Sequence, residues 1–419
     1  MSVEQEVPSI SAGRTVHVTV VLLFSAWLID YADRLLITLA LPAIGVEFDL
    51  SRGEQGLLVS AFFLAYAIFQ IPGGVLADRL GARKMILVAV LVWSIFTAAT
   101  GFAWSFAVLL IVRFLFGAAE GIFPPASMKV LVERTNEQER MSANGLIMSS
   151  NAIAAVLTPL AMTPLIAAFG WRSAFFSTAA LGVLVLLAIQ LGLPRPLART
   201  TPRVPVQPPP LRAVLRLRVL WYFGAIMFGY NVIGWGLTTW VPTYLTEQRG
   251  IPLTSAGVLL AVPALATAVA VVIGGRLADR LEGNQRLVIV PGMTVSALAL
   301  ILMADSGSLA AFVAFASVAM FAASLAYMPI FAVPLRALPA EYLGVGSAVI
   351  IVGGQLAGMV TPPVVGVIAD HLSFEVAFGF LVLGAVIAAV MAIITPQNAA
   401  SFRAAIGVPE VPSVDKEVS

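Results

Sequence analysis

Long apolar runs separated by short polar segments dominate the chain. A helix that crosses a bilayer needs about 20 apolar residues, and it satisfies all of its backbone polar groups internally. The pattern therefore predicts an all-α integral membrane protein with twelve transmembrane helices. We expect these helices at residues 17–41, 55–76, 85–103, 105–127, 142–166, 173–193, 219–242, 255–277, 287–304, 309–335, 343–368 and 375–395.

Composition supports this fold class and excludes others. Apolar residues make up 60% of the 419 residues and charged residues 11%, against about 45–50% and about 25% in soluble domains. So little charge cannot cover the surface of a water-soluble protein of this length. The chain has no Cys, which excludes disulfide frameworks and thiolate metal sites.

Lys and Arg are distributed unevenly between the two sides of the predicted bundle. If the N-terminus lies inside, 19 of the 24 basic residues fall on that side, three fall on the other, and two lie within helices. Because cytoplasmic loops carry the excess of Lys and Arg, we expect both termini and the loop 194–218 in the cytoplasm.

The loop 194–218 is basic, rich in Pro and free of acidic residues, and it divides the predicted helices six and six. We expect an N-terminal half at 1–193, a linker at 194–218, a C-terminal half at 219–395 and a cytoplasmic tail at 396–419. The linker is read as a solvated connection that helps to set topology, with contact to lipid headgroups as the alternative.

Two loop segments repeat one another. GGVLADRLGARK (residues 73–84) follows the second predicted helix, and GGRLADRLEGNQR (residues 274–286) follows the eighth; Asp78 and Asp279 are 201 residues apart. A long-range repeat of this kind indicates two parallel six-helix halves, an arrangement typical of transporters that bind their substrate between the repeats.

The first of these loops resembles the signature of the major facilitator superfamily, and the resemblance covers essentially the whole chain. It implies that Gly74 permits close approach of helices. It also implies that Asp78 pairs across the two halves and stabilises an outward-open state. The residues of this expected conformational-switch loop are Gly74, Asp78, Arg79, Gly81, Arg83 and Lys84.

A narrower resemblance lies in IDYADRLLITLALP (residues 29–42) and VRFLFGAAEGIFPP (residues 112–125). Both are similar to the anion:cation symporter branch, which includes bacterial sugar-acid carriers and vesicular glutamate transporters. The resemblance implies that Asp33, Arg34, Arg113 and Glu120 are the working charges.

Further positions match this branch less closely. Tyr31, Tyr66 and Asn151 correspond to cavity-lining positions in sugar-acid carriers, although hydrogen bonds between helices are an equal alternative. In GGQLAGMVTPP (residues 353–363), Gln355 stands where the branch commonly has Asn. We include Gln355 among the expected substrate-binding residues, and this departure leaves the identity of the substrate open.

Five charged residues within predicted helices also stand out on physical grounds: Asp30, Asp33 and Arg34 in the first, and Arg113 and Glu120 in the fourth. Charges at membrane depth are costly and usually face a bundle interior or a cavity. Asp30 and Arg34 are spaced to bond along one helix, and Asp33 is free to meet Arg113 across the interface. Arg113 and Glu120 lie within about 20° of one face and about 10.5 Å apart along the axis.

Together these residues favour a secondary active transporter with proton-coupled uptake of an organic anion such as a sugar acid or hydroxy acid. Arginine suits carboxylate binding, so Arg34 is expected to hold the substrate. Carboxylates removed from water take up protons more readily, so Asp33 and Glu120 are expected to couple protons. Asp30 and Arg113 complete the charge network, and structural locking of the helices by buried Asp–Arg pairs is the alternative role.

Other functions remain open or are disfavoured. A proton-coupled exporter of drugs or metabolites and a sodium-coupled anion carrier are the alternatives within transport. An enzyme or an ATP-driven pump is disfavoured, because the sequence has neither a Walker motif nor a His/Cys/Asp metal cluster. We expect no cofactor, no metal and no nucleic acid. The expected partners are a small organic anion, protons and the lipid bilayer, for a monomer in a bacterial-type inner membrane.

Overall fold

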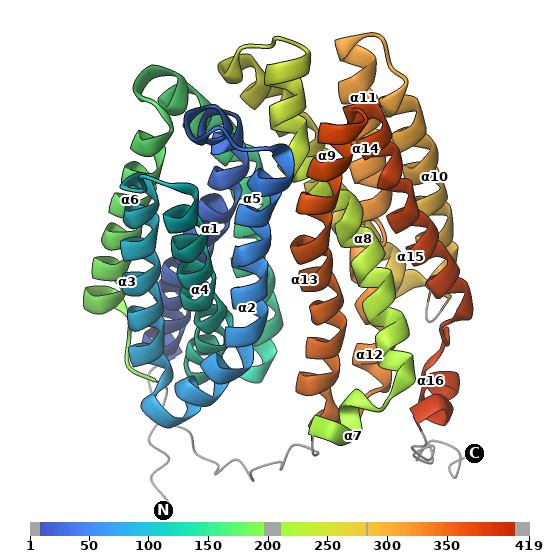
Figure 1. Ribbon diagram of the computed structural model, residues 1–419. Helices are drawn as coiled ribbons and strands as arrows, with labels where there is room; N and C mark the ends of the chain where they lie inside the picture. Colours follow the sequence, from blue (N-terminus) through green and yellow to red (C-terminus); the bar gives the residue numbers. More distant parts are fainter. Residues whose placement is uncertain (1–8, 197–210, 282–283, 407–419) are drawn as a thin grey trace, which may run out of the picture. The chain divides into compact units, whose positions relative to one another are not determined.

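The computed structural model describes residues 9–196, 211–281 and 284–406, and these residues form helices joined by short turns, with no strand among them (Figure 1). Residues 197–210 of the predicted linker, Glu282 and Gly283 of the second loop, and residues 407–419 of the tail lie outside the described residues. The first helices are α1 (Ser9–Phe48), α2 (Arg52–Leu80), α3 (Ala82–Gly101), α4 (Phe106–Arg134), α5 (Glu137–Phe169) and α6 (Trp171–Gly192). After the linker follow α7 (Leu211–Leu215), α8 (Arg218–Thr243), the π-helical turn η1 (Tyr244–Gln248), α9 (Leu253–Arg280), α10 (Arg286–Ala304), α11 (Leu309–Ser324), α12 (Tyr327–Ala337), α13 (Ala340–His371), α14 (Phe374–Phe380), α15 (Val382–Ile394) and α16 (Ala399–Ile406).

Among the described residues, ten helical segments are long and apolar enough to cross a membrane. The two other predicted spans, 17–41 and 219–242, fall on α1 and α8, which are helical over these residues. Two of the predicted spans lie in segments long enough to cross a membrane but contain a short interruption of the helix. The segment 309–335 is divided between α11 and α12, where Pro329 cannot donate the backbone hydrogen bond to Leu325. The segment 375–395 is divided between α14 and α15 at Leu381.

Contacts between residues divide the chain into two compact units. The first contains residues 1–203, 238–265 and 362–371, and the second contains residues 204–237, 266–361 and 372–419. The charged residues Asp30, Asp33, Arg34, Arg113 and Glu120 all belong to the first unit. The division of the chain into halves at the linker stays a prediction.

The start of α2 shows why residues 238–265 and 362–371 belong to the first unit. The Asp370 carboxylate accepts hydrogen bonds from the backbone N–H groups of Arg52 (3.2 Å) and Gly53 (2.9 Å). The Arg52 guanidinium binds Glu247 at 3.0 Å and Asp370 at 3.4 Å. Ser51 and Glu54 add a capping box, so the free N–H groups of the first turn are well satisfied.

Glycines let α2 and α4 pack backbone to backbone. A Cβ atom at Gly121 would lie 2.7 Å from the Tyr66 carbonyl oxygen, and one at Gly117 would meet the Phe62 carbonyl oxygen. Only hydrogen fits at such positions, because close-packed interiors leave no room for an added methyl group. This contact brings the aromatic side chains of α2 beside the charged residues of α4.

This packing generates a stability prediction. Gly121→Ala should lower the apparent melting temperature of the purified protein, because overpacking costs about 1–3 kcal/mol. The matched control is Gly145→Ala on α5, where an added Cβ meets nothing within 4 Å and helix propensity favours Ala by about 1 kcal/mol. Equal melting temperatures for the two variants would show that α2 and α4 separate freely at this point.

Candidate functional site

The charged residues of α1 and α4 form one buried cluster in the first unit. Asp30 and Glu120 are fully buried, Asp33 and Arg113 are 1% exposed, and Arg34 is 8% exposed. Such burial is costly for a charge that has no partner, because the desolvation of an isolated ion costs several kcal/mol.

Arg34 lies at the centre of this cluster. Its Nη2 atom donates hydrogen bonds to Asp30 Oδ2 at 3.1 Å and to Glu120 Oε2 at 3.0 Å. The predicted contact between Asp30 and Arg34 along α1 is therefore present. The contact with Glu120 was not expected, since the helical spacing suggested Arg113 as the neighbour of Glu120 on α4. One guanidinium nitrogen thus joins two carboxylates.

Asp33 has a different partner from the one suggested by the sequence. It accepts a hydrogen bond from the hydroxyl of Thr97 on α3, and it forms no ion pair with Arg113 within 4 Å among the described residues. Thr97 Oγ1 also lies 3.0 Å from the Trp93 carbonyl oxygen. A hydroxyl has one hydrogen to donate, so Thr97 donates to Asp33 or to Trp93, but not to both at once.

Arg113 packs against aromatic rings. Its guanidinium carbon lies 4.6 Å from the centroid of Phe116 and 5.4 Å from that of Phe62, and its buried Nε atom has no hydrogen-bond partner. These distances are typical of cation–π contacts. Arg113 therefore keeps its charge without a neutralising carboxylate within 4 Å among the described residues.

Aromatic rings also surround Arg34. Its guanidinium carbon lies 4.8 Å from the Tyr66 ring centroid, 5.1 Å from Phe62 and 5.7 Å from Tyr31. Both expected tyrosines are thus at the cluster. Phe62, Phe116 and Thr97 were missed in the sequence, where nothing distinguishes them from the many other apolar and hydroxyl residues of the predicted helices.

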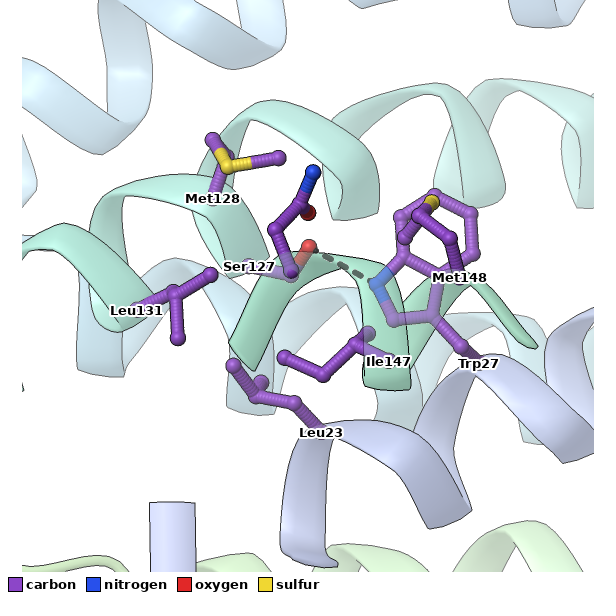
Figure 2. A pocket seen from close by; sticks show the side chains of 8 residues that line it. Leu23, Trp27, Ser127, Met128, Leu131, Ile147 and Met148 are labelled. Atoms are coloured by element: carbon purple, nitrogen blue, oxygen red, sulfur yellow. Dashed lines mark hydrogen bonds between the residues drawn. The ribbon is translucent and has the colours of Figure 1, made fainter. Parts of the chain in front are cut away.

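A packed seam sets the register of α1 against α4 (Figure 2). The indole N–H of Trp27 donates to Ser127 Oγ at 3.1 Å, and the rings of Trp27 and Phe123 lie 5.1 Å apart. Trp27 precedes Arg34 by seven residues and Ser127 follows Glu120 by seven, so the two contacts are two helical turns apart on both antiparallel helices.

The remaining predicted binding residues take part in none of these contacts. Asn151 is on α5 of the first unit and Gln355 is on α13 of the second, and the side-chain oxygen of each is buried without a hydrogen-bond partner. Both amides are therefore available as acceptors within their own units. Among the described residues, no group of His, Asp and Glu could hold a metal ion.

The acidic residues of the two repeated loops form ion pairs within their own units, and their switching role stays a prediction. Asp78 binds Lys129 of α4 at 2.7 Å within the first unit, and its repeat counterpart Asp279 binds Arg336 at 3.0 Å within the second. Within the first unit the close approach is found at Gly73, and the role of Gly74 stays a prediction. A Cβ at Gly74 would make an ordinary contact of 3.7 Å with Pro125, whereas a Cβ at Gly73 would lie 2.7 Å from the Ile122 Cα atom.

The other loop residues form the turn between α2 and α3. Gly81 has a φ of +92°, a conformation that favours glycine. Arg83 donates to the Gln190 carbonyl at the end of α6 at 2.7 Å, and Arg79 and Lys84 are exposed.

Comparison with known proteins agrees with this geometry. The family model of the Major Facilitator Superfamily matches residues 22–362 and 254–410, and the chain belongs to this superfamily of membrane transporters. It is therefore a multi-pass transporter and not an enzyme.

Similar proteins carry organic anions. A probable sulfoacetate transporter of Cupriavidus necator is 29% identical over 87% of this chain and 90% of its own length. A probable galactarate/D-glucarate transporter of Escherichia coli is 27% identical over 90% of this chain and 93% of its own length. The hexuronate transporter of Bacillus subtilis is 29% identical over 62% of this chain and 64% of its own length.

The fold is also found among solved structures. A bacterial homologue of the human lysosomal transporter Spinster, in an inward-facing and unoccupied conformation, aligns with a TM-score of 0.76 and 19% identity. The alignment covers 95% of this chain and 99% of that one. At this level of identity the similarity concerns the fold alone.

The shared nitrogen of Arg34 predicts non-additive mutational effects. Asp30→Asn leaves Arg34 paired with Glu120, and Glu120→Gln leaves it paired with Asp30, so each single variant should retain most of its stability. The double variant leaves a buried guanidinium without a carboxylate and should lose about 3–5 kcal/mol, measured as a fall in melting temperature well beyond the sum of the single effects.

The control pair is Asp305→Asn with Glu375→Gln, which removes the same charges from exposed positions and should be additive. Additive losses for Asp30 and Glu120 as well would show that Arg34 does not depend on either carboxylate.

Proposed function

We propose that the protein is a proton-coupled carrier that takes up a small organic carboxylate, such as a sugar acid or hydroxy acid, by alternating access. The observation that carries this proposal is the single Arg34 nitrogen bonded to both Asp30 and Glu120. The anions named for the similar transporters, sulfoacetate, hexuronate and galactarate or glucarate, support the substrate class. Twelve helices in two halves, cytoplasmic termini, an inner-membrane location and a monomeric state are part of the proposal.

Competition for Arg34 supplies the coupling. A substrate carboxylate and the Glu120 carboxylate both require the same guanidinium, and an ionised Glu120 opposes the substrate. A proton on Glu120 weakens its hold on Arg34 and frees donors for bidentate binding of the substrate. Because each ligand favours the binding of the other, and linkage is reciprocal, the proton and the anion travel together, as symport requires.

Asp33 provides a second proton site. It depends on one hydroxyl, Thr97, and has an oxygen, Oδ1, that is buried without a partner. A protonated Asp33 can donate to Thr97, which then donates to the Trp93 carbonyl instead. The Thr97 hydroxyl can therefore hydrogen-bond to Asp33 whether Asp33 is ionised or protonated, and no helix has to move.

Substrate binding generates a prediction about Arg34. Arg34→Lys retains the charge but loses the planar fork that matches a carboxylate. Affinity for a bound sugar acid should fall by about 1.5–3 kcal/mol, or roughly 10- to 150-fold, in a titration of the purified protein with galacturonate, glucarate and sulfoacetate. Arg172→Lys, at an exposed ion pair with Glu47, is the matched control. Wild-type affinity in Arg34→Lys, with a loss in Arg113→Lys, would move the anion site to Arg113.

Coupling generates a prediction about Glu120. Glu120→Gln imitates a permanently protonated acid, so it should retain exchange of substrate between pre-loaded vesicles and lose uphill accumulation driven by a proton gradient. Glu375→Gln, an exposed acid, should retain both. If Asp33 carries a second proton, Asp33→Asn behaves like Glu120→Gln, and uptake of a monoanion responds to voltage at about 2.3 kcal/mol per 100 mV.

The same vesicles separate the alternatives. Uphill accumulation at the wild-type level in Glu120→Gln would contradict the role of Glu120. Uptake that survives a protonophore but stops without sodium would favour a sodium-coupled carrier. Substrate movement opposite to the proton flow would favour an exporter.

A further inference from the structure

A basic cavity lies in the first unit, away from the charged cluster. It has a volume of about 500 Å³ and opens where the turn between α2 and α3 meets the last turns of α4 and α6. Arg83, Lys84 and Arg134 line it, and Glu133 is the single acidic residue of the lining. The cavity wall therefore carries a net charge of +2 from these four side chains.

Two of the cations retain unused hydrogen-bond donors. Arg134 is 1% exposed, and its Nε and Nη1 atoms donate to Pro194 (2.8 Å), Val130 (3.1 Å) and Glu133 (3.0 Å). No described residue accepts a hydrogen bond from its Nη2 atom. Lys84 is exposed and has no hydrogen bond or ion pair with any described residue. The cavity is thus lined by a buried guanidinium nitrogen, Arg134 Nη2, and by the ammonium group of Lys84, and both have hydrogen-bond donors to offer.

The start of α3 adds backbone donors to the same wall. Gly81 precedes the helix without a side-chain cap, and the first backbone bond runs from Met85 N to the Gly81 carbonyl. The N–H groups of Ala82, Arg83 and Lys84 therefore have no partner inside the helix. Free N–H groups and the positive end of the helix dipole favour an anion.

The neighbouring chain does not supply that anion. The linker 194–218 begins beside the cavity at Pro196 and contains six arginines and no acidic residue. A second positive segment cannot neutralise the wall, and Glu133 is the single acidic residue among those that line it. Two apolar residues, Leu80 and Leu87, also line the wall. Helices α3 and α6 pack together, and each exposes a further leucine, Leu91 on α3 and Leu187 on α6.

We propose that this cavity binds the phosphate group of an anionic ligand, with a phospholipid headgroup as the source that its surroundings favour. A phosphate diester offers several oxygen acceptors to Lys84, to Arg134 Nη2 and to the start of α3. The exposed leucines of α3 and α6 then cover the acyl chains. The lipid binds at the Lys- and Arg-rich end of the bundle, where anionic headgroups attract basic residues.

The experiment uses full-length protein in neutral detergent, titrated with phosphatidylglycerol while its melting temperature is recorded. Phosphatidylglycerol should raise the melting temperature, and phosphatidylcholine, whose choline group the basic wall repels, should not. In Arg83→Gln/Lys84→Gln the apparent affinity should fall roughly 30-fold, from the loss of two basic groups near the headgroup. Lys84→Arg should retain the wild-type response.

Arg79→Gln is the matched control, because Arg79 is exposed on the same turn but does not line the cavity. It should bind phosphatidylglycerol as the wild type does. Equal stabilisation by the two lipids, or equal losses in Arg79→Gln and in the double variant, would overturn the proposal. Inorganic phosphate provides a second arm: protection by millimolar phosphate that the double variant loses supports the site and identifies a soluble phosphate as its ligand.

Discussion

The site depends on one guanidinium nitrogen shared by two carboxylates. Arg34 Nη2 holds Asp30 of its own helix and Glu120 of α4, and all three side chains are almost completely removed from water. A carboxylate stabilises a buried arginine, and hydrogen-bond donors stabilise a buried carboxylate. One cation facing two anions leaves an excess negative charge, and Asp30 Oδ1 and Glu120 Oε1 lack partners. The cluster therefore remains stable when one of the two acids is removed. With both acids present, neither has hydrogen-bond partners for both of its oxygens.

The helix packing delivers this geometry. Trp27 and Ser127 fix α1 against α4 two turns from the ion pair, so a slip of either helix would separate Arg34 from Glu120. Gly117 and Gly121 hold α2 against a neighbouring face of α4, which places Phe62 and Tyr66 over the Arg34 guanidinium. A polar contact worth little in water becomes specific here because the surrounding helices allow few alternative registers.

The sequence predicts the type and the positions of the helices better than the contacts between them. Apolar runs predict the positions of the helices, and the i, i+4 spacing predicts the ion pair between Asp30 and Arg34. Both predictions succeed because helix formation and i, i+4 contacts depend on local geometry. Which helices face each other depends on packing between distant segments. Arg34 therefore meets Glu120 and Asp33 meets Thr97 without any local signal. The division of the predicted helix at 309–335 could have been anticipated from Pro329, whereas nothing in the sequence explains the interruption at Leu381.

The two arginines of the cluster are connected through a single ring. Phe62 lies 5.1 Å from the Arg34 guanidinium carbon and 5.4 Å from that of Arg113, so one aromatic side chain contacts both cations. Its π-electrons attract each of them, and its bulk keeps two like charges apart. If Arg34 turns from Glu120 toward a substrate, the Phe62 ring that it contacts must adjust. Arg113 contacts the same ring and is therefore affected as well. Phe62 thus connects the proton site that we propose at Glu120 to Arg113. The electric field of Arg113 extends this connection to Asp33, although no direct ion pair joins these two residues.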